Sequence, residues 1–201
     1  MSRQLILVRH GQTVDNVNGI AQGWNDSALS EAGPEQVQRL ASRLAQLKPT
    51  AIYSSPLGRA LATAEAISAA TGLPITQLDD LREMSYGGWE GRSFLDVRRE
   101  DESTYQRWIH DAEASCPDGE SHATVRRRIE RALGQINSER PVVVTHGTAI
   151  RIAVTALLDV PVLTAMQFAQ DNAALNLFVW RGDRWVLKVW NDSTHCLNTE
   201  R

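Results

Sequence analysis

Two histidines follow apolar runs of the chain, and each is itself followed by glycine. The run Leu5-Ile6-Leu7-Val8 leads into Arg9-His10-Gly11, and the run Val142-Val143-Val144 leads into Thr145-His146-Gly147. Short unbroken apolar runs are typical of strands buried on both faces. A single histidine after a strand is more often a hydrogen-bonded structural residue, but ligands of open α/β sheets bind at the carboxyl ends of the strands. Two such strands in one sheet would place both imidazoles at one rim, and this repetition favours chemistry.

Two arginines add positive charge to these histidines. Arg9 directly precedes His10, and Arg59 falls in the first turn of a helix predicted over 57–71, where a cation opposes the helix dipole. Most arginines lie on the solvated surface. Because a cation at this position of a helix is unfavourable, Arg59 is expected to have a functional role. Two guanidiniums and two imidazoles together suit a tetrahedral dianion such as phosphate. The chain contains neither a Walker A sequence nor G-x-G-x-x-G, which argues against nucleotide binding by those loops.

These residue types also predict a reaction at phosphorus. Neighbouring arginines lower the pKa of His10 and keep its ring neutral, as a nucleophile requires. An alcohol leaving group needs a proton donor, and Glu83 is the candidate because a bound phosphate dianion favours its acid form. The same carboxylate then activates water to attack the phosphohistidine, while Arg9, Arg59 and His146 stabilise the equatorial oxygens.

The histidines do not form a metal-binding pattern. The five are His10, His110, His122, His146 and His195. No H-x-x-x-H or H-E-x-x-H spacing occurs among them, and the predicted arginines of the site repel a cation. We therefore expect no metal in the site.

The composition bounds the class of protein. A chain of 201 residues, of which 42% are hydrophobic, predicts one globular domain over residues 1–201. The formal net charge of -3 argues against a nucleic-acid partner, and no apolar run of 18 residues is present for a membrane span. Cys116 and Cys196 form no C-x-x-C pair, and the first residues lack an apolar signal region. These features predict a cytoplasmic protein that does not associate with membranes.

Strand and helix signals alternate along most of the chain. Strands are predicted at 5–8, 51–54, 75–78 and 141–145. The amphipathic helices between them, the first capped by Ser30, favour a three-layer α/β/α sandwich with a central, mostly parallel mixed sheet. Residues 175–190 predict an antiparallel hairpin with a two-residue turn, and residues 93–120 predict a helical insertion over the sheet edge and the active site. A solvated helix face is expected from Arg126, Arg127, Arg128 and Arg131.

Four stretches of the sequence, in this order, resemble the signatures of one family. Arg9-His10-Gly11-Gln12-Thr13 with Asn16 resembles the RHG signature of the histidine phosphatase superfamily, the phosphoglycerate mutase-like proteins. Ser54-Ser55-Pro56-Leu57-Gly58-Arg59-Ala60 is similar to the second motif of that family. Glu83 with Gly87-Gly88-Trp89-Glu90-Gly91 is similar to its third motif, and Thr145-His146-Gly147 to its fourth. A lone RHG is weak, whereas the ordered set is specific.

The resemblance implies an α/β fold with a central mixed sheet and a phosphohistidine on the residue matching His10. It implies hydrolysis without a metal or an organic cofactor, and phosphate contacts by the residues matching Arg9, Asn16, Arg59 and His146. The expected substrate-binding residues are Asn16, Gln22, Gly147, Trp24, Tyr86 and Trp108. The three aromatic residues could line the mouth and select the leaving group, although aromatic residues more often pack in the core. Gln12 replaces the glutamate that is commoner in the family, which leaves the nucleophile and the arginines intact.

These observations predict a metal-independent phosphomonoesterase that acts on a small phosphorylated metabolite. Two alternatives remain open: a phosphoglycerate mutase, and a non-catalytic protein that binds phosphorylated ligands. The stretch Ser103–Trp108 is similar to alpha-ribazole phosphatases, whereas Asp171-Asn172-Ala173 with residues 191–197 is similar to phosphoserine and sugar-phosphoglycerate phosphatases. The tryptophans of the final hairpin leave open two uses, core packing or a homodimer interface.

Overall fold

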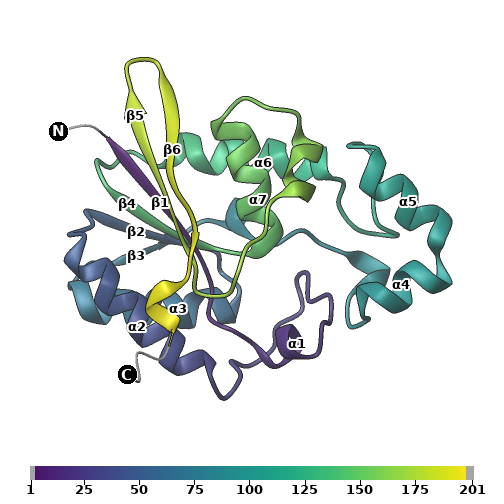
Figure 1. Cartoon of the computed structure of the whole chain (residues 1–201), viewed down its shortest axis with the longest axis horizontal. Helices are drawn as coiled ribbons and strands as arrows, with labels where there is room; N and C mark the ends of the chain where they lie inside the picture. Colours follow the sequence, from purple (N-terminus) through teal and green to yellow (C-terminus); the bar gives the residue numbers. More distant parts are fainter. Residues whose placement is uncertain (1–2, 198–201) are drawn as a thin grey trace.

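The computed structural model describes residues 3–197, so residues 1–2 and 198–201 of the expected domain lie outside the described residues. One sheet organises this part of the chain, with strand order β3-β2-β4-β1-β5-β6 (Figure 1). The strands are β1 (Gln4–Arg9), β2 (Ala51–Ser54), β3 (Ile75–Gln77), β4 (Pro141–Thr145), β5 (Leu175–Arg181) and β6 (Arg184–Asp192). Strands β1 to β4 run parallel, whereas the hairpin β5–β6 joins β1 antiparallel. The sheet is therefore mixed and mostly parallel, as predicted.

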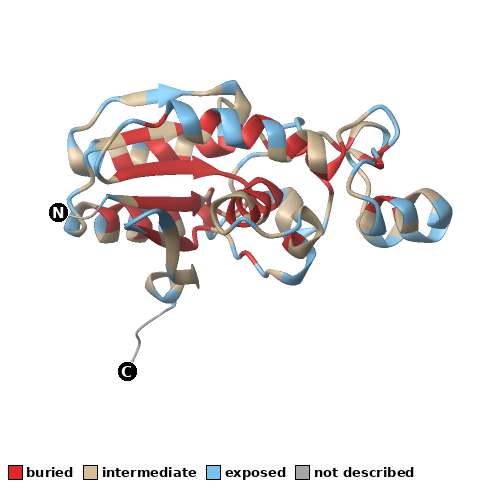
Figure 2. Cartoon of the chain, turned by 90° about the horizontal axis from the view of Figure 1, so that it is seen from above, coloured by how far each residue is buried: buried red, intermediate tan, exposed pale blue. Residues whose placement is uncertain are grey.

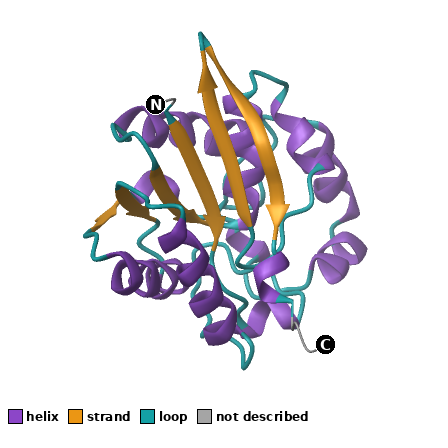
Figure 3. Ribbon diagram, turned by 60° about the vertical axis from the view of Figure 1, so that its left-hand side comes forward, coloured by secondary structure: helices purple, strands orange, loops and turns teal. Residues whose placement is uncertain are grey.

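Helices cover both faces of the sheet, which confirms the three-layer fold (Figure 3). The α-helices of the described chain are α1 (Val14–Val17), α2 (Gly33–Gln46), α3 (Gly58–Thr71), α4 (Phe94–Glu100), α5 (Glu102–His110), α6 (His122–Gln135) and α7 (Gly147–Leu157). Short 3-10 helices lie at η1 (Asp79–Leu81), η2 (Gly87–Trp89), η3 (Val162–Gln167) and η4 (Thr194–Cys196). Leu5 and Leu7 of β1 pack in the core beneath α6 and α7, and Ile6 and Val8 pack beneath α2 and α3. Because successive strand residues point to opposite faces, a strand covered on both faces has a continuous apolar sequence.

Strands β1 and β4 bring the two His-Gly turns together. They pair in parallel with Arg9 opposite Thr145, and the backbone N–H of His10 donates to the Thr145 carbonyl at 3.0 Å. Helix α7 begins at Gly147, directly after His146, and α3 follows β2, the other neighbour of β4. Both histidines and both helix N-termini therefore lie at the carboxyl edge of the sheet.

Helices α4 and α5 stand outside the three layers, beyond the carboxyl edge of the sheet (Figure 1). Much of their surface is exposed or half-buried, as the blue and tan ribbon of Figure 2 shows. Trp108 joins them to the body of the molecule, because it is 4% exposed and its ring lies 5.6 Å from that of Trp89 and 6.1 Å from that of Phe94. The predicted helical insertion thus forms two helices, and its function over the site stays a prediction.

The cap that the sequence predicts for α2 is wrong. The helix begins at Gly33 rather than after Ser30, and the Ser30 hydroxyl instead donates to the side chain of Gln12 at 2.8 Å. Pro34 lies in the first turn, where its missing N–H leaves no intrahelical bond unmade. The short helix α1 likewise interrupts the loop that the sequence suggests after β1.

The final hairpin contributes to the core. Trp185 and Trp190 are half-buried and pack against the cluster beneath α6 and α7. Trp180 is 36% exposed, with its ring 5.3 Å from that of Trp185 in an edge-to-face arrangement. A homodimer interface at this hairpin stays a prediction. Within residues 3–197, none of the helices has the length and apolar character to cross a membrane.

Candidate active site

A cavity of about 230 Å³ lies at the carboxyl edge of the sheet, where β1 and β4 end. Its walls come from the turn after β1, the loop before η2, and the starts of α3, α4 and α7. Eight of the predicted site residues line it: Arg9, His10, Asn16, Gln22, Arg59, Glu83, Tyr86 and Gly147. The fold thus brings together residues that are more than a hundred positions apart in the chain.

His10 is held with one nitrogen bonded and the other available. It is 2% exposed, and Nδ1 lies 2.7 Å from the carbonyl oxygen of Gly11. A carbonyl only accepts, so Nδ1 carries the hydrogen and Nε2 keeps its lone pair. Burial lowers the pKa of His10 well below its usual value, and the charges of Arg9 and Arg59 lower this pKa further. His10 is therefore a neutral imidazole near neutral pH, and Nε2 carries an unprotonated lone pair.

Arg59 is held in place by hydrogen bonds to the loop 23–26. It is 3% exposed, and its guanidinium donates to Asp26 Oδ1 at 3.0 Å and to the carbonyls of Asn25 and Gly23 at 2.7 Å each. The Asp26 carboxylate also accepts the backbone N–H of Gly58 at 2.5 Å, so it caps α3 and offsets the unfavourable position of a cation there. Nε of Arg59 is buried and has no hydrogen-bond partner in residues 3–197.

Arg9 is a second guanidinium that lines the cavity. Its guanidinium donates to the carbonyl of Gln170 at 2.5 Å, while its buried Nε has no partner among the described residues. Burial lowers the pKa of Arg9, and the nearby Glu83 opposes this shift. A Cβ at Gly147 would lie 3.3 Å from Arg9 Nε, so the glycine leaves the space that this guanidinium occupies. Buried N–H groups without partners are rare and costly, which makes both arginine Nε groups candidate donors to an anion.

His146 has a buried ring nitrogen without a partner in the described chain. It is fully buried, its ring centroid lies 5.1 Å from that of His10, and its Nε2 is 2.8 Å from the Ser55 hydroxyl. Nδ1 has no partner in the described chain. In the tautomer in which the Ser55 hydroxyl donates to Nε2, the ring hydrogen lies on Nδ1. Burial lowers the pKa of His146 well below its usual value, with Arg59 as the largest charged contribution, and keeps the ring neutral.

Glu83 is held at the N-terminus of α7. Its carboxylate accepts the backbone N–H groups of Thr148 and Ala149 at 3.0 Å each and that of Met84 at 2.9 Å. The carboxylate is thereby fixed against the helix that begins after His146, and it faces the same cavity as His10. This position suits a group that exchanges protons with a ligand on His10.

Arg128 corrects the expectation of a wholly solvated arginine face on α6. Arg127 and Arg131 are exposed, but Arg128 is 6% exposed. Its guanidinium contacts both carboxylate oxygens of Glu120 at 2.8 Å each. It also donates to the carbonyls of Asp80, Arg82 and Glu83 at 2.9, 2.6 and 2.8 Å. Helical periodicity could not find this role, because the partners are carbonyls of a distant irregular segment.

Asn16 and Gln22 place amide groups at the cavity. Oδ1 of Asn16 accepts the side chain of Asn172 at 2.8 Å and the backbone N–H of Thr13 at 3.2 Å, which leaves its NH2 group to donate. Gln22 is 6% exposed, and its Oε1 has no partner in the described residues. Gln12, where the sequence departs from the family pattern, bonds to Ser30 outside this cavity.

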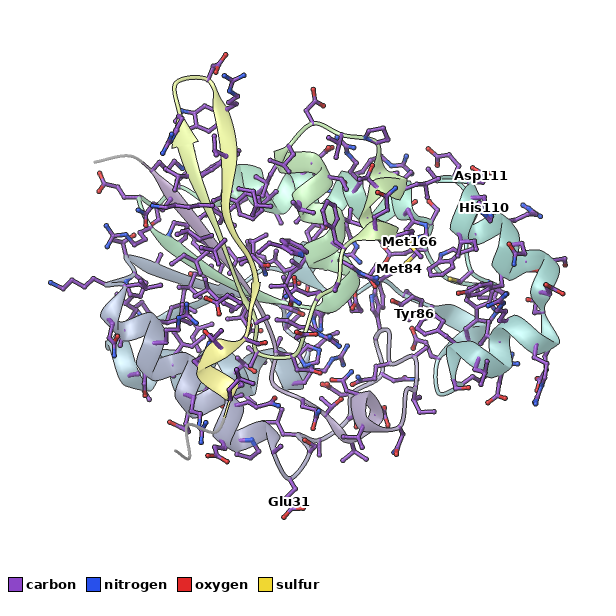
Figure 4. The ribbon with its side chains drawn as sticks, viewed as in Figure 1. Glu31, Met84, Tyr86, His110, Asp111 and Met166 are labelled. Carbon is purple, nitrogen blue, oxygen red and sulfur yellow. The ribbon has the colours of Figure 1, made fainter. Side chains whose placement is uncertain are left out.

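The three aromatic residues expected at the mouth have different positions. Tyr86 lines the cavity, and its hydroxyl lies 2.7 Å from that of Thr148; Figure 4 shows it between the sheet and helices α4 and α5. Trp24 does not line the cavity: it is 45% exposed, and its Nε1 donates to the Glu83 carbonyl at 2.9 Å. The prediction that Trp108 lines the cavity is wrong. Its side chain packs in the aromatic core, where its ring centroid lies 4.7 Å from that of His122. Phe94 lines the cavity in its place.

Sequence reasoning missed three further polar residues of the cavity, Thr148, Arg151 and Gln170. Arg151 lies on α7 four positions after Gly147, a spacing that returns to the same helix face and could have indicated it. Gln170 lies in an irregular loop, where no periodic signal exists. Within residues 3–197, no three His, Cys, Asp or Glu side chains come together as metal ligands.

Comparison with known proteins places these features in a family. The model of the "Histidine phosphatase superfamily (branch 1)" matches residues 5–193. The protein named "Probable phosphoglycerate mutase GpmB" from Erwinia tasmaniensis is 31% identical over 206 residues, covering 98% of this chain and 96% of that protein.

Three solved structures are similar over nearly the whole chain. A mycobacterial glucosyl-3-phosphoglycerate phosphatase, in complex with VO3, has a TM-score of 0.84 and 32% identity over 94% of this chain and 99% of that chain. Phosphoserine phosphatase from Entamoeba histolytica has a TM-score of 0.85 and 30% identity over 96% and 99% of the two chains. Alpha-ribazole phosphatase from Shigella flexneri has a TM-score of 0.85 and 27% identity over 94% and 96%. With its four motifs assembled around one cavity, the chain belongs to branch 1 of the histidine phosphatase superfamily.

Proposed function

We propose that this protein is a metal-independent phosphomonoesterase that hydrolyses a small phosphorylated metabolite through a phosphohistidine on His10. The observation that carries the proposal is the neutral His10 ring in one cavity with two guanidiniums, each with a buried Nε that has no partner in the described chain. A lone-pair nitrogen beside unpaired cationic N–H groups suits attack on a phosphate, whose equatorial oxygens accept those donors.

In the first step, Nε2 of His10 attacks phosphorus and the bond from phosphorus to the ester oxygen breaks. The departing oxygen takes a proton from the acid form of Glu83. Arg9 and Arg59 balance the negative charge of the phosphoryl oxygens, and Nδ1–H of His146 is a further donor. The products of this step are the free alcohol and a phosphohistidine.

In the second step, water attacks the phosphohistidine, and the bond from phosphorus to Nε2 breaks. The Glu83 carboxylate takes a proton from that water, which restores its acid form. Inorganic phosphate leaves, and His10 returns to the neutral ring held by Gly11. Three backbone N–H bonds keep Glu83 at one place for both transfers. The phosphatase activity of the three similar solved proteins also supports hydrolysis.

One alternative has an observation in its favour. The identity with the GpmB protein, named as a phosphoglycerate mutase, favours transfer of phosphate between the hydroxyls of phosphoglycerate. The two activities differ in outcome, because a mutase returns phosphoglycerate whereas a phosphatase releases inorganic phosphate.

The test measures phosphate release in excess EDTA by wild type and His10→Ala. The substrates are p-nitrophenyl phosphate, phosphoserine, 3-phosphoglycerate, glucosyl-3-phosphoglycerate and alpha-ribazole phosphate. His110→Ala, on the exposed end of α5, is the matched control. We expect release by wild type and by the control, and loss in His10→Ala. Unchanged release by His10→Ala, or interconversion of phosphoglycerates without release, contradicts the proposal.

A further inference from the structure

Asn172 contacts two residues of the candidate site, although it does not line the cavity itself. It is half-buried in the loop between η3 and β5. Its side-chain NH2 group donates to the backbone carbonyl of His10 at 3.3 Å and to Oδ1 of Asn16 at 2.8 Å. One amide therefore joins the backbone of the proposed nucleophile to a polar side chain of the cavity wall.

These hydrogen bonds fix which way both amides face. A backbone carbonyl only accepts, so the atom of Asn172 that lies near the His10 carbonyl is the NH2 nitrogen. That nitrogen requires an acceptor on Asn16, and the backbone N–H of Thr13, at 3.2 Å, requires one as well. Both donors meet Oδ1 of Asn16, and its Nδ2 has no hydrogen-bond partner within residues 3–197. The NH2 group of Asn16 is thus the side that remains for a ligand in the cavity.

The orientation of the Asn16 amide decides whether it attracts or repels an anion. Phosphate oxygens accept hydrogen bonds, so an NH2 group contributes to binding, whereas an amide oxygen at the same place repels them. The last torsion of an asparagine side chain is broad and two-fold, so hydrogen bonds select between the two orientations. Asn172 supplies the shorter of the two bonds that make this selection.

The loop that carries Asn172 is itself fixed on both sides. On the side of the cavity, the backbone carbonyl of Gln170 accepts the Arg9 guanidinium at 2.5 Å. On the other side, the backbone N–H of Asp171 donates to Oδ1 of Asn191 at 2.6 Å, and Nδ2 of Asn191 donates back to the Asp171 carboxylate at 3.1 Å. The loop therefore holds two of the residues that are expected to donate to a phosphate.

We infer that Asn172 is a positioning residue of the phosphate site, which holds the Asn16 amide with its NH2 group toward the anion. This inference rests on the proposed function of the same site. The His10 carbonyl does not depend on Asn172, because it also accepts the backbone N–H of Ala173 at 3.0 Å. Removal of the Asn172 side chain leaves Oδ1 of Asn16 with the N–H of Thr13 only, so the main loss falls on the orientation of Asn16.

The test is a double-mutant cycle on the binding of inorganic phosphate, measured by calorimetric titration. Because a hydrogen bond to a charged ligand is lost, Asn16→Ala should weaken phosphate binding about 10- to 100-fold. Asn172→Ala should weaken it about 5- to 20-fold, since Thr13 still holds part of the Asn16 population. If Asn172 acts only through Asn16, the double variant should bind phosphate within about twofold of Asn16→Ala. Losses that multiply, as two independent groups give, overturn the inference.

Two variants separate positioning from packing. Asn172→Leu keeps the approximate volume of the side chain but removes its donors, so it should lose as much phosphate affinity as Asn172→Ala. Wild-type affinity in Asn172→Leu would show a packing role and overturn the inference. Asn18→Ala removes an exposed amide directly after α1 and is the matched control, which should stay within about twofold of wild type.

Kinetics with p-nitrophenyl phosphate provide a second readout. A contact made equally in the bound ester and in the transition state changes KM, so Asn172→Ala should raise KM about 5- to 20-fold and change kcat less than about threefold. A loss in kcat with unchanged KM and phosphate affinity overturns the inference. Phosphate binding needs no turnover, so a non-additive cycle supports the inference even where no ester is hydrolysed. Hydrolysis with an additive cycle overturns the inference alone, and a wild type that binds no phosphate overturns both proposals.

Discussion

Replacing Arg128 by methionine removes five hydrogen bonds that hold the chain around Glu83. Two of them neutralise the Glu120 carboxylate, whose side chain is 14% exposed. The other three satisfy carbonyls of the segment that ends at Glu83. The substitution keeps the length of the apolar stem, so the change isolates the loss of the charged head.

The expected loss in the free energy of unfolding depends on the groups that Arg128→Met leaves without a partner. Glu120 keeps one other contact in this cluster, from the Ser85 backbone N–H at 2.9 Å, and the Glu83 carbonyl keeps the Trp24 indole. Removing one partner of a buried ion pair costs about 3–5 kcal/mol, because the other charge stays buried. With a urea m-value of about 2 kcal/mol per molar, the midpoint of unfolding should fall by about 1.5–2.5 M. The kcat should also fall, by about tenfold, because the backbone at Glu83 loses one of the contacts that position it, and small displacements of a catalytic group are costly.

Urea unfolding followed by tryptophan fluorescence measures the first effect, and steady-state kinetics with p-nitrophenyl phosphate measures the second. Arg127→Met is the matched control, because this neighbour on α6 is 57% exposed, and its midpoint should stay within about 0.5 M of wild type. In Arg128→Met/Glu120→Gln, removal of the stranded charge should restore at least about 1.5 kcal/mol. The claim that Arg128 stabilises the segment around Glu83 would be refuted by either of two results. The first is a fall of less than about 0.5 M in the urea midpoint of Arg128→Met. The second is a double variant that is no more stable than the single one.

Three further predictions concern the buried groups in and around the site. Burial lowers the pKa of His122 to about 4, below its unfolded value of 6.5. The unfolded chain therefore binds the extra proton, and His122 should contribute about 1.4 kcal/mol per pH unit to the loss of stability as the pH falls from 6.5 to 4. The other buried histidines add to the total slope, so His122→Phe should reduce the slope by the share of His122 in urea titrations at several pH values. Gly147→Ala places a Cβ 3.3 Å from Arg9 Nε, and should raise KM for all phosphate esters with little change in the unfolding midpoint. Asp26→Ala removes the cap of α3 and the partner of Arg59, and should destabilise the fold by about 1–2 kcal/mol and weaken inhibition by vanadate.

Each of these three has an outcome that contradicts it. If the dependence of stability on pH is unchanged in His122→Phe, the buried His122 ring does not contribute to the loss of stability in acid. An effect of Gly147→Ala on only one ester would place the glycine at the leaving group rather than at Arg9. Unaltered vanadate inhibition in Asp26→Ala would mean that Arg59 is held by its carbonyl contacts alone.

The sheet and its edge could be predicted because their signals are local. Leu5–Val8 and Val142–Val144 are continuous apolar runs, and a strand buried on both faces requires that pattern. The parallel pairing then places His10 beside His146 as a consequence of topology. The start of α2 could not be found in this way, since Ser30 has the side chain of a cap but uses it on Gln12 across a turn.

The proposed nucleophile and its arginines were visible in the sequence, whereas the groups that orient them were not. The orienting residues, among them Asp26, Ser55 and Arg128, act through contacts to residues distant in the chain. No period or spacing encodes such contacts. Trp108 shows that residue type alone does not locate a side chain. A tryptophan suits a cavity wall, yet this one is buried in the core against Trp89 and His122.

The most direct test of the phosphohistidine mechanism is to trap the intermediate in Glu83→Gln with p-nitrophenyl phosphate. Its leaving group needs no proton, so phosphorylation should proceed, while attack by water lacks its base and the intermediate should accumulate. Mass spectrometry of peptides after an alkaline quench should find one phosphoryl group on His10, more of it than in wild type, and none in His10→Ala. Release of p-nitrophenol without any phosphoryl group on His10, or with the group on another residue, would contradict the account.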